Sequence, residues 1–227
     1  MIAGVEKFDG IGMTSARTRA RMVERLREQG IVDEGVLSAM GSVPRHIFVE
    51  EALAIRAYED SPLPIGAGQT ISQPYVVARM TELLRAGSRR RRVLEVGTGC
   101  GYQTAILALL SDEVYTVERI ATLVAKARRN LRALKLNNIR IKHGDGSINL
   151  GETLAVDGII VTAGAREVPT PLLDYLEVGG RMVLPLTGRG GEDRGTQFLT
   201  VIDKTADGLR EQTYDAVRFV PLLPGIA

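Results

Sequence analysis

The chain has 227 residues, of which 44% are hydrophobic and 25% are charged, with 29 Lys and Arg against 27 Asp and Glu. These proportions are typical of globular domains and exclude a disordered, collagen-like or low-complexity chain. The formal net charge of +2 gives no general reason to expect nucleic acid or an anionic membrane as a partner. The length suits one α/β domain with a full hydrophobic core.

The cysteine content and the apolar runs bear on the compartment. The only cysteine, Cys100, can form neither an internal disulfide nor a cysteine zinc site by itself. Residues 1–13 lack the apolar stretch of a secretion signal. The longest apolar run, Ala105–Leu110, is far too short to cross a bilayer. We therefore expect a cytoplasmic monomer without a metal ion, which binds neither nucleic acid nor membrane.

The N-terminal third of the chain is predicted to be mainly helical. A flexible tail over residues 1–13 precedes a helix over residues 14–29. In this helix Met22 and Leu26 share one face, and Gly30 supplies a C-terminal stop. The arginine-rich opposite face is interpreted as a solvated surface.

Two shorter segments follow this helix. Asp33 is placed to cap a second helix that runs through Met40. Pro44 disfavours helical backbone at Val43, so residues 43–49 are predicted to be an extended connector.

Prolines and glycines then predict a loop over residues 57–73. A helix is expected to begin at Pro74 and to end at Gly87. Residues 88–92 contain four consecutive arginines, which are interpreted as a solvated turn before a buried strand. Contact with phosphate is the alternative for this run.

From Val93 onward, short apolar strands alternate with helices. Strands are predicted at residues 93–96, 114–117, 139–143, 157–162 and 181–186, and helices at residues 102–110, 120–134 and 168–176. Two last strands, 197–203 and 212–219, are joined through Asp207-Gly208 as an antiparallel hairpin, and residues 188–195 form a mobile loop. This order predicts an α/β fold with a doubly wound, mostly parallel sheet and an N-terminal helical extension.

Ligands of such sheets bind beyond the carboxyl ends of the strands, near the switch in strand order. Gly97, Gly99 and Gly101 follow the first of these strands as G-x-G-x-G, and the helix after them presents free N–H groups. A dinucleotide fingerprint needs its third glycine one position later, where Tyr102 stands. The pattern fits a smaller ligand without a pyrophosphate, such as S-adenosylmethionine, although a structural turn is the alternative.

Acidic residues follow the next two strands. Glu118 could accept hydrogen bonds from both hydroxyls of a ribose, or it could cap the next helix. Asp145 could accept a hydrogen bond from an adenine amine while Gly146 leaves room for the ring, or both could form a plain turn. Three suitable contacts at three consecutive strand ends favour an adenosyl ligand over three unrelated turns.

Ser72 lies outside the alternating part, just before the helix expected at Pro74. Its hydroxyl could hold a substrate carboxylate beside a reactive methyl group. A local helix cap is the alternative, and by itself the position favours the cap.

Several segments of the chain resemble protein-L-isoaspartate O-methyltransferases. They are residues 43–49, 60–65, 69–74, 93–99, 114–119, 157–163, 179–185 and 217–222. The resemblance spans nearly the whole chain after the N-terminal tail. The glycine turn is common to many methyltransferases, whereas Thr70–Pro74 is much more specific to this family.

The resemblance implies a Rossmann-like methyltransferase of one globular domain, with a helical and substrate-loop region at 14–87 and a cofactor-binding core at 88–227. It implies methyl transfer from S-adenosylmethionine to the free α-carboxylate of L-isoaspartyl residues in damaged proteins and peptides. The ester then closes to a succinimide, which hydrolyses partly to aspartate, and S-adenosylhomocysteine is left.

The resemblance also assigns the site residues, with Ser72 as the catalytic residue. It places the cofactor against Thr70, Ile71, Glu95, Gly97, Thr98, Gly99, Gly101, Glu118, Arg119, Asp145, Gly146 and Thr162. It places the substrate against Thr70, Ser72, Val217, Arg218 and Val220.

Two departures from the family and two other functions complete the analysis. Ser147–Leu150 stands where relatives carry a Gly-Trp pair, and Cys100, often Ser in relatives, is interpreted as structural. A methyltransferase of the same fold with a small molecule or RNA as acceptor remains an alternative, as does a module that binds the cofactor without transferring methyl. His46 and His143 are interpreted as structural, because a carboxylate acceptor needs no general base.

Overall fold

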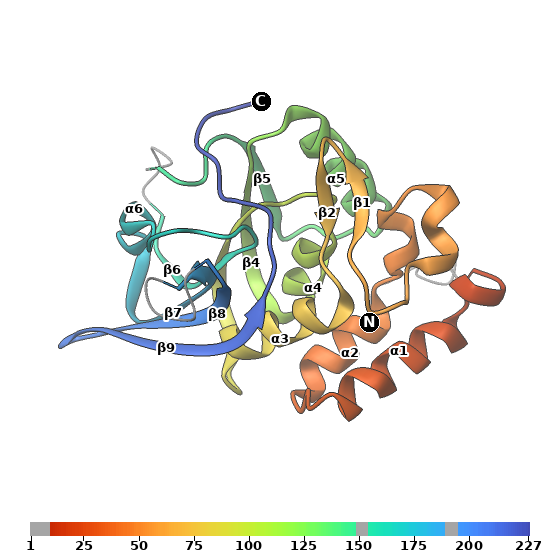
Figure 1. Cartoon of the computed structure of the whole chain (residues 1–227), viewed down its shortest axis with the longest axis horizontal. Helices are drawn as coiled ribbons and strands as arrows, with labels where there is room; N and C mark the ends of the chain where they lie inside the picture. The colour runs from red at the N-terminus through yellow and green to blue at the C-terminus, as the bar shows by residue number, and fades with distance from the viewer. Residues whose placement is uncertain (1–9, 149–153, 189–194) are drawn as a thin grey trace.

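The computed structural model describes residues 10–148, 154–188 and 195–227, and its centre is a seven-stranded sheet in the order β5-β4-β3-β6-β7-β8-β9 (Figure 1). The strands are β3 (Arg90–Val96), β4 (Ser111–Glu118), β5 (Ile139–His143), β6 (Val156–Val161), β7 (Leu176–Thr187), β8 (Gln197–Thr205) and β9 (Gly208–Val217). The first five strands run parallel, and β8 and β9 are antiparallel to their neighbours. The predicted sheet and its C-terminal hairpin are therefore confirmed.

Six α-helices surround this sheet in the described part of the chain. They are α1 (Ala16–Glu28), α2 (Glu34–Ser42), α3 (Pro74–Arg85), α4 (Tyr102–Leu110), α5 (Ala121–Ala133) and α6 (Thr170–Leu173). Ser15 caps α1 and Asp33 caps α2, each by accepting a main-chain N–H three residues on. None of these helices has both the length and the apolarity needed to cross a membrane.

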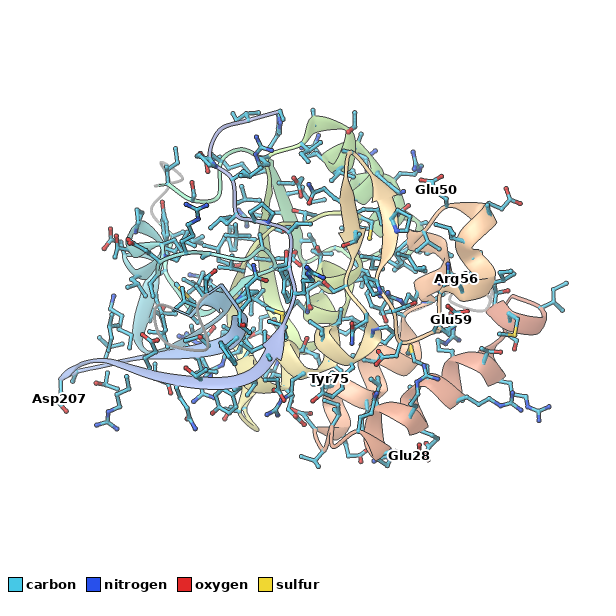
Figure 2. All side chains as sticks on the ribbon, in the orientation of Figure 1. Glu28, Glu50, Arg56, Glu59, Tyr75 and Asp207 are labelled. Carbon is cyan, nitrogen blue, oxygen red and sulfur yellow. The ribbon has the colours of Figure 1, made fainter. Side chains whose placement is uncertain are left out.

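Alternation along the strands divides the core between the two faces of the sheet. Val93 and Ile160 pack with Leu84 of α3 and with α4, whereas their neighbours in sequence, Leu94 and Ile159, pack on the opposite face near α6. The helix α1 packs against α2 and α3, and α2 packs against α4, through a separate apolar cluster. The β8–β9 hairpin projects from this body, with Asp207 near its tip (Figure 2).

The strand order reverses beside β3. The chain passes from β3 to β4 and β5 on one side and then returns to β6 on the other side of β3. Connections from the carboxyl ends of β3 and β6 therefore leave in opposite directions, which opens a crevice between them. The position of the candidate site follows from this topology.

Two predictions for the N-terminal region are wrong. Residues 43–49 are not extended throughout, because Arg45–Phe48 forms a 3₁₀ turn that Pro44 initiates. The predicted loop over 57–73 contains a hairpin of β1 (Leu63–Gly66) and β2 (Gln69–Ile71). The turn between the two strands is made by three consecutive residues with positive φ, two of which are glycines. These glycines, together with the prolines nearby, give the segment the composition of a loop.

The prediction for the arginine run is wrong in part: the side chains of Arg89, Arg91 and Arg92 are exposed as expected, but most of the run belongs to a strand and not to a turn. Strand β3 begins at Arg90, which pairs with Ser111 of β4. The Asp157 carboxylate also accepts the main-chain N–H groups of Arg91 at 2.9 Å and Arg92 at 2.8 Å. The side chains of Arg91 and Arg92 form ion pairs with Glu177 and Glu113, respectively. These pairings engage the run within the protein and give no support to the phosphate alternative.

The helix predicted over 168–176 is reduced to the four residues of α6, because Leu176 already pairs with Val156 as the start of β7. Pairing with the sheet overrides local helix propensity here. The predicted tail at 1–13 is described only from Gly10, with a 3₁₀ turn at Gly12–Thr14. Most of the loop predicted at 188–195 lies outside the described residues.

Candidate active site

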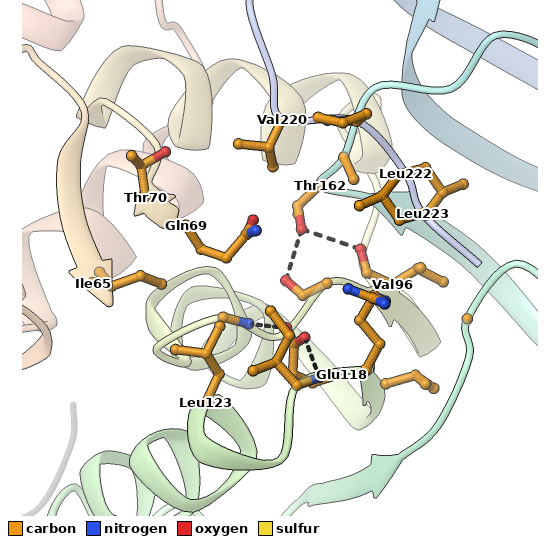
Figure 3. A pocket seen from close by; sticks show the side chains of 18 residues that line it. Ile65, Gln69, Thr70, Val96, Glu118, Leu123, Thr162, Val220, Leu222 and Leu223 are labelled. Carbon is orange, nitrogen blue, oxygen red and sulfur yellow. Dashed lines mark hydrogen bonds between the residues drawn. The ribbon is translucent and has the colours of Figure 1, made fainter. Parts of the chain in front are cut away.

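A cavity of about 660 Å³, its open mouth included, lies at the carboxyl ends of β3, β4 and β6 (Figure 3). Val96 and Gly97 line it at the end of β3, Glu118 at the end of β4, and Thr162 after β6. The cavity lies beyond the strand ends at the switch in strand order, where the sequence predicts the ligand to bind.

The glycine turn after β3 is packed so closely that side chains are excluded from it. Gly97 has a φ of +100°, and a Cβ there would lie 2.3 Å from the hydroxyl of Thr162. That hydroxyl donates to the carbonyl oxygens of Gly97 at 2.7 Å and Val96 at 3.1 Å (Figure 3). A Cβ at Gly146 would likewise lie 2.5 Å from Val96. The result is a cradle of main-chain atoms, which allows close approach of a ligand.

Glu118 links this turn to the next helix. One carboxylate oxygen accepts the N–H of Gly99 and the other accepts the N–H of Ile120, each at 2.9 Å (Figure 3). The bond to Ile120 corresponds to the alternative in which Glu118 caps the next helix. The same carboxylate also lines the cavity, so the cap does not exclude a role in ligand binding. Each oxygen keeps a second lone pair, so Glu118 can still accept hydroxyl groups of a ligand.

A second cavity of about 430 Å³ adjoins the first and is lined by Ile71, Ser72 and Thr98. The two cavities share Ile65, Thr70, Gly97, Gly99 and Thr162. Within the described part of the chain, α3 begins at Pro74 after Gln73, and no side chain caps it. The structure therefore does not support the local-cap alternative for Ser72, whose hydroxyl has no hydrogen-bond partner among the described residues.

The chain after β9 covers one side of the first cavity. Gly164 and the strand-like segment 220–222 exchange two main-chain hydrogen bonds of 2.8 Å, from Gly164 to Val220 and from Leu222 to Gly164. Arg119 donates from Nε to the carbonyl oxygen of Gly225 at 3.0 Å. Residues 220–223 therefore form a wall of the cavity, although they lie far in sequence from the strand ends.

The structure brings eleven of the predicted site residues to the two cavities. They are Thr70, Ile71, Ser72, Gly97, Thr98, Gly99, Glu118, Arg119, Gly146, Thr162 and Val220. The other five do not line either cavity: Glu95, Gly101, Asp145, Val217 and Arg218. Gly101 instead caps α4 with a φ of +91°, where a Cβ would press on Leu131 at 3.1 Å.

Glu95 is buried beneath the glycine turn. Its Oε2 accepts the hydroxyls of Thr104 at 2.5 Å and Thr116 at 2.6 Å, and Oε1 has no partner among the described residues. Complete burial raises the pKa of Glu95 to about 8, although the two hydroxyls act in the opposite direction. At neutral pH Glu95 is therefore mostly protonated. Thr116 also contacts the hydroxyl of Thr98 at 2.6 Å, which connects Glu95 to the cavity wall.

Asp145 connects the third strand end to the C-terminal segment. One carboxylate oxygen accepts from the N–H and hydroxyl of Ser147, and the other accepts from the N–H of Gly225 at 2.5 Å. Partial burial acts to raise the pKa of Asp145, but these hydrogen bonds outweigh it and lower the pKa below its usual value. Part of the Ser147–Leu150 departure lies outside the described residues.

Several cavity residues were missed by the sequence analysis. In the described chain they are Ile65, Gln69, Val77, Met80, Val96, Cys100, Tyr102, Gln103, Val117, Ile120, Leu123, Ala163 and residues 221–223. The alternation of buried Leu63 and Ile65 with exposed Pro64 was a usable signal for β1. No local signal marks residues 221–223, because only their pairing with Gly164 brings them to the cavity.

The topology and the glycine cradle define a class of protein. The turn approaches its ligand through main chain at Gly97 and Gly146 but lacks the third-glycine spacing for a dinucleotide, and Glu118 stands ready for hydroxyl groups. These residues fit an adenosyl group, and the class is that of Rossmann-like, S-adenosylmethionine-dependent methyltransferases.

Comparisons with known proteins identify the family. A family model described as protein-L-isoaspartate(D-aspartate) O-methyltransferase matches residues 17–226, and the chain belongs to that family. A protein-L-isoaspartate O-methyltransferase of Methylobacillus flagellatus is 59% identical over 96% of this chain and 97% of its own. One from Nitrosomonas eutropha is 57% identical over 96% and 97%.

A solved structure gives the same result at lower identity. A protein-L-isoaspartate O-methyltransferase from Plasmodium falciparum, in complex with S-adenosyl-L-homocysteine, matches with a TM-score of 0.75 and 29% identity. The match covers 90% of this chain and 98% of that one. The predicted family and fold are therefore confirmed.

Proposed function

We propose that this chain transfers a methyl group from S-adenosylmethionine to the free α-carboxylate of L-isoaspartyl residues in damaged proteins and peptides. Membership of the family supports the reaction. The observation that carries it is the junction of the two cavities, where the cofactor cradle and Ser72 share Thr70, Gly97, Gly99 and Thr162 as lining. A donor on one side of that shared wall can reach an acceptor on the other.

The cofactor would be held by the glycine cradle, with Gly146 leaving room for the adenine and Glu118 accepting the ribose hydroxyls. When bound, it supplies a methyl group on a sulfonium, which the substrate carboxylate takes with its own electron pair, leaving a neutral ester and S-adenosylhomocysteine. Thr70 and Val220 form the surrounding wall. Asp145 would act near the adenine through Gly146, since its own carboxylate is already engaged by Gly225.

Ser72 orients the acceptor in this proposal and does not deprotonate it. A carboxylate with a pKa of about 4 is already ionised at pH 7, so no general base is required. The hydroxyl of Ser72 is free to donate to one carboxylate oxygen and so leave the other oxygen directed at the methyl group. Orientation of this kind can supply about 7–11 kcal/mol in favourable cases.

The N-terminal region at 14–87 carries the acceptor side and the core at 88–227 carries the cofactor side of one globular domain in this proposal. Damaged proteins and peptides are then the partners of a cytoplasmic monomer. The buried thiol of Cys100 suits a reducing compartment.

The test uses two peptides that differ only in an isoaspartyl or an aspartyl linkage, with labelled S-adenosylmethionine as donor. Label should appear on the isoaspartyl peptide alone. Label on the aspartyl peptide to the same extent, or only on added RNA or small molecules, would contradict the proposed acceptor. Absence of transfer despite binding of S-adenosylhomocysteine would indicate a binding module.

Ser72→Ala should lower kcat/KM for the isoaspartyl peptide by about 1–3 kcal/mol, or roughly 5- to 150-fold, because one oriented donor is lost. The affinity for S-adenosylhomocysteine should change much less. Ser88→Ala, at an exposed serine after α3, is the matched control and should turn over normally. Unchanged turnover by Ser72→Ala would show that this residue has another role.

A further inference from the structure

Arg45 is a fully buried cation in the 3₁₀ turn Arg45–Phe48. No carboxylate forms an ion pair with it in the part of the chain that the structure describes. Burying an unpaired charge is costly for folding, so the protein must either tolerate this cost or use the charge. Arg85, by contrast, is a partly buried arginine that forms an ion pair with Asp33.

The guanidinium of Arg45 joins segments that are distant in sequence. Its Nε donates to the carbonyl oxygen of Ala57, and one terminal nitrogen donates to that of Ser72, each at 2.7 Å. Its Cζ lies over the ring of Tyr102, 4.8 Å from the ring centroid. The other terminal nitrogen is buried and has no hydrogen-bond partner among the described residues.

These contacts reach both sides of the second cavity. Ser72 lines that cavity on the acceptor side, and Tyr102 lines it as the first residue of α4, directly after the glycine turn. Arg45 itself does not line the cavity. It therefore contacts two residues of the cavity lining, Ser72 and Tyr102, without being part of the lining.

A planar fork is needed for this arrangement. Lysine carries the same charge but cannot present two divergent donors in a fixed plane to two carbonyl groups and also stack on an aromatic ring. Methionine has a similar apolar stem and neither donors nor charge. These two replacements therefore separate the charge of Arg45 from its geometry.

We propose that Arg45 is a positioning residue for methyl transfer, which fixes the main chain of Ser72 against Tyr102 so that the Ser72 hydroxyl meets the acceptor carboxylate. The inference rests on the proposed function, because it assigns Arg45 an effect through Ser72. Its action is on the orientation of the acceptor and not on the cofactor cradle.

The experiment is a double-mutant cycle of Arg45→Lys and Ser72→Ala, with isoaspartyl peptide turnover, thermal melting and calorimetry of S-adenosylhomocysteine as readouts. Arg45→Lys should lower kcat at least tenfold, with KM for the peptide and affinity for S-adenosylhomocysteine within about threefold. In the double variant, kcat should fall no more than about twofold below that of Ser72→Ala. The melting temperature, by contrast, should fall for Arg45→Lys whether or not Ser72 is present.

Arg85→Lys is the matched control, because Arg85 is a partly buried arginine whose Nε lies 2.8 Å from a carboxylate oxygen of Asp33. Neither residue lines either cavity. It should lower the melting temperature while kcat stays within twofold of the wild type. Arg45→Met should reduce kcat at least as far as Arg45→Lys, and the lysine variant carries the test if the methionine variant does not fold.

Two results would overturn the inference. One is a wild-type kcat for Arg45→Lys, and the other is losses in kcat that multiply in the double variant, since Arg45 would then act independently of Ser72. A Ser72→Ala variant with normal turnover would instead contradict the role that the proposed function gives to Ser72. The failure of the inference and the failure of that role are therefore distinguishable.

Discussion

The two cavities share a wall, yet their outer walls are assembled from different kinds of contact. The cofactor side is formed by main chain at neighbouring strand ends, where Gly97 and Gly146 exclude side chains and Glu118 bonds two N–H groups. The acceptor side depends on the side chain of Arg45, which joins Ser72 to Tyr102, a residue 57 positions from Arg45 by sequence number (102 − 45).

This difference predicts which measured quantity a substitution on each side should change. Errors in the cofactor cradle should reduce the affinity for S-adenosylhomocysteine, because the cradle is the binding surface. Errors behind Ser72 should reduce turnover while that affinity is kept. The substitutions below test this separation in order of decreasing effect.

Gly97→Ala should have the largest effect on the cofactor side. The positive φ and the 2.3 Å approach of a Cβ to the Thr162 hydroxyl force the turn to move. We expect a loss of roughly 2–5 kcal/mol from strain and overpacking. Calorimetry should show S-adenosylhomocysteine binding at least a hundredfold weaker.

The control for this change is Gly30→Ala. Gly30 has a similar φ of +97°, but a Cβ there meets nothing within 4 Å. It should lower stability through backbone strain alone and leave cofactor affinity intact. Equal losses of affinity in both variants would show that the clash in the cradle is not the cause.

Glu118→Ala should weaken S-adenosylhomocysteine binding by about 1–3 kcal/mol, because the Gly99 and Ile120 N–H groups lose their acceptor and the ribose loses its partner. Calorimetry at constant pH measures the change. Glu24→Ala, at an exposed glutamate on α1, should bind normally. Normal binding by Glu118→Ala would refute the assignment to ribose.

Glu95 lies beneath the cradle but outside the cavity, so we expect it to affect the pH dependence of stability and not the contacts with the cofactor. Its pKa is about 8 in the folded chain against 4.5 for the unfolded reference. Between these values the unfolded chain has lost the proton that the folded chain keeps, so the free energy of unfolding falls as pH rises. The contribution reaches up to about 1.4 kcal/mol per pH unit and ends above the folded pKa.

Glu95→Gln should remove this slope, because an amide has no proton to lose in that range. Urea unfolding at several pH values between 5 and 8.5 would measure it, since the two variants should differ most at the alkaline end. An identical slope in both would mean that Glu95 does not carry the pH dependence.

The last prediction concerns the reactivity of the Cys100 thiol in the folded protein. Burial raises the pKa of its thiol to about 11, so very little thiolate exists at pH 8. Iodoacetamide should therefore label the native protein at least a hundredfold more slowly than the urea-unfolded protein, as mass spectrometry can follow. Fast native labelling would show that the acceptor cavity opens to solvent at Cys100.

Local patterns were sufficient for much of the α/β core. The bounds predicted for α4 and β5, Tyr102–Leu110 and Ile139–His143, are those observed. Glycines, an acidic residue after β4 and the hairpin after β7 were also readable, because each depends on neighbours a few positions away. Two of these glycines, Gly97 and Gly99, and the acidic residue after β4 line the first cavity.

The acceptor side was readable only in part. The catalytic role of Ser72 is implied by resemblance to a family, while its position before a helix favoured a cap that the structure does not contain. Glu95 is assigned to the cofactor by the same resemblance, yet it packs under the turn with Thr104 and Thr116. Burial and partner are properties of the packed chain, which no single motif encodes.

By itself, the sequence determined the alternation of strands and helices and the glycine turn, because backbone conformation and apolar periodicity are local. Only the tertiary structure decided that Arg45 bonds to the main chain of Ser72 and that residues 220–223 close one side of the cavity. It also decided that β7 begins at Leu176, the last residue of a predicted helix, because Leu176 pairs with Val156 of β6. These features join segments far apart in the chain, and their free energy exists only once the segments are brought together by the packed core.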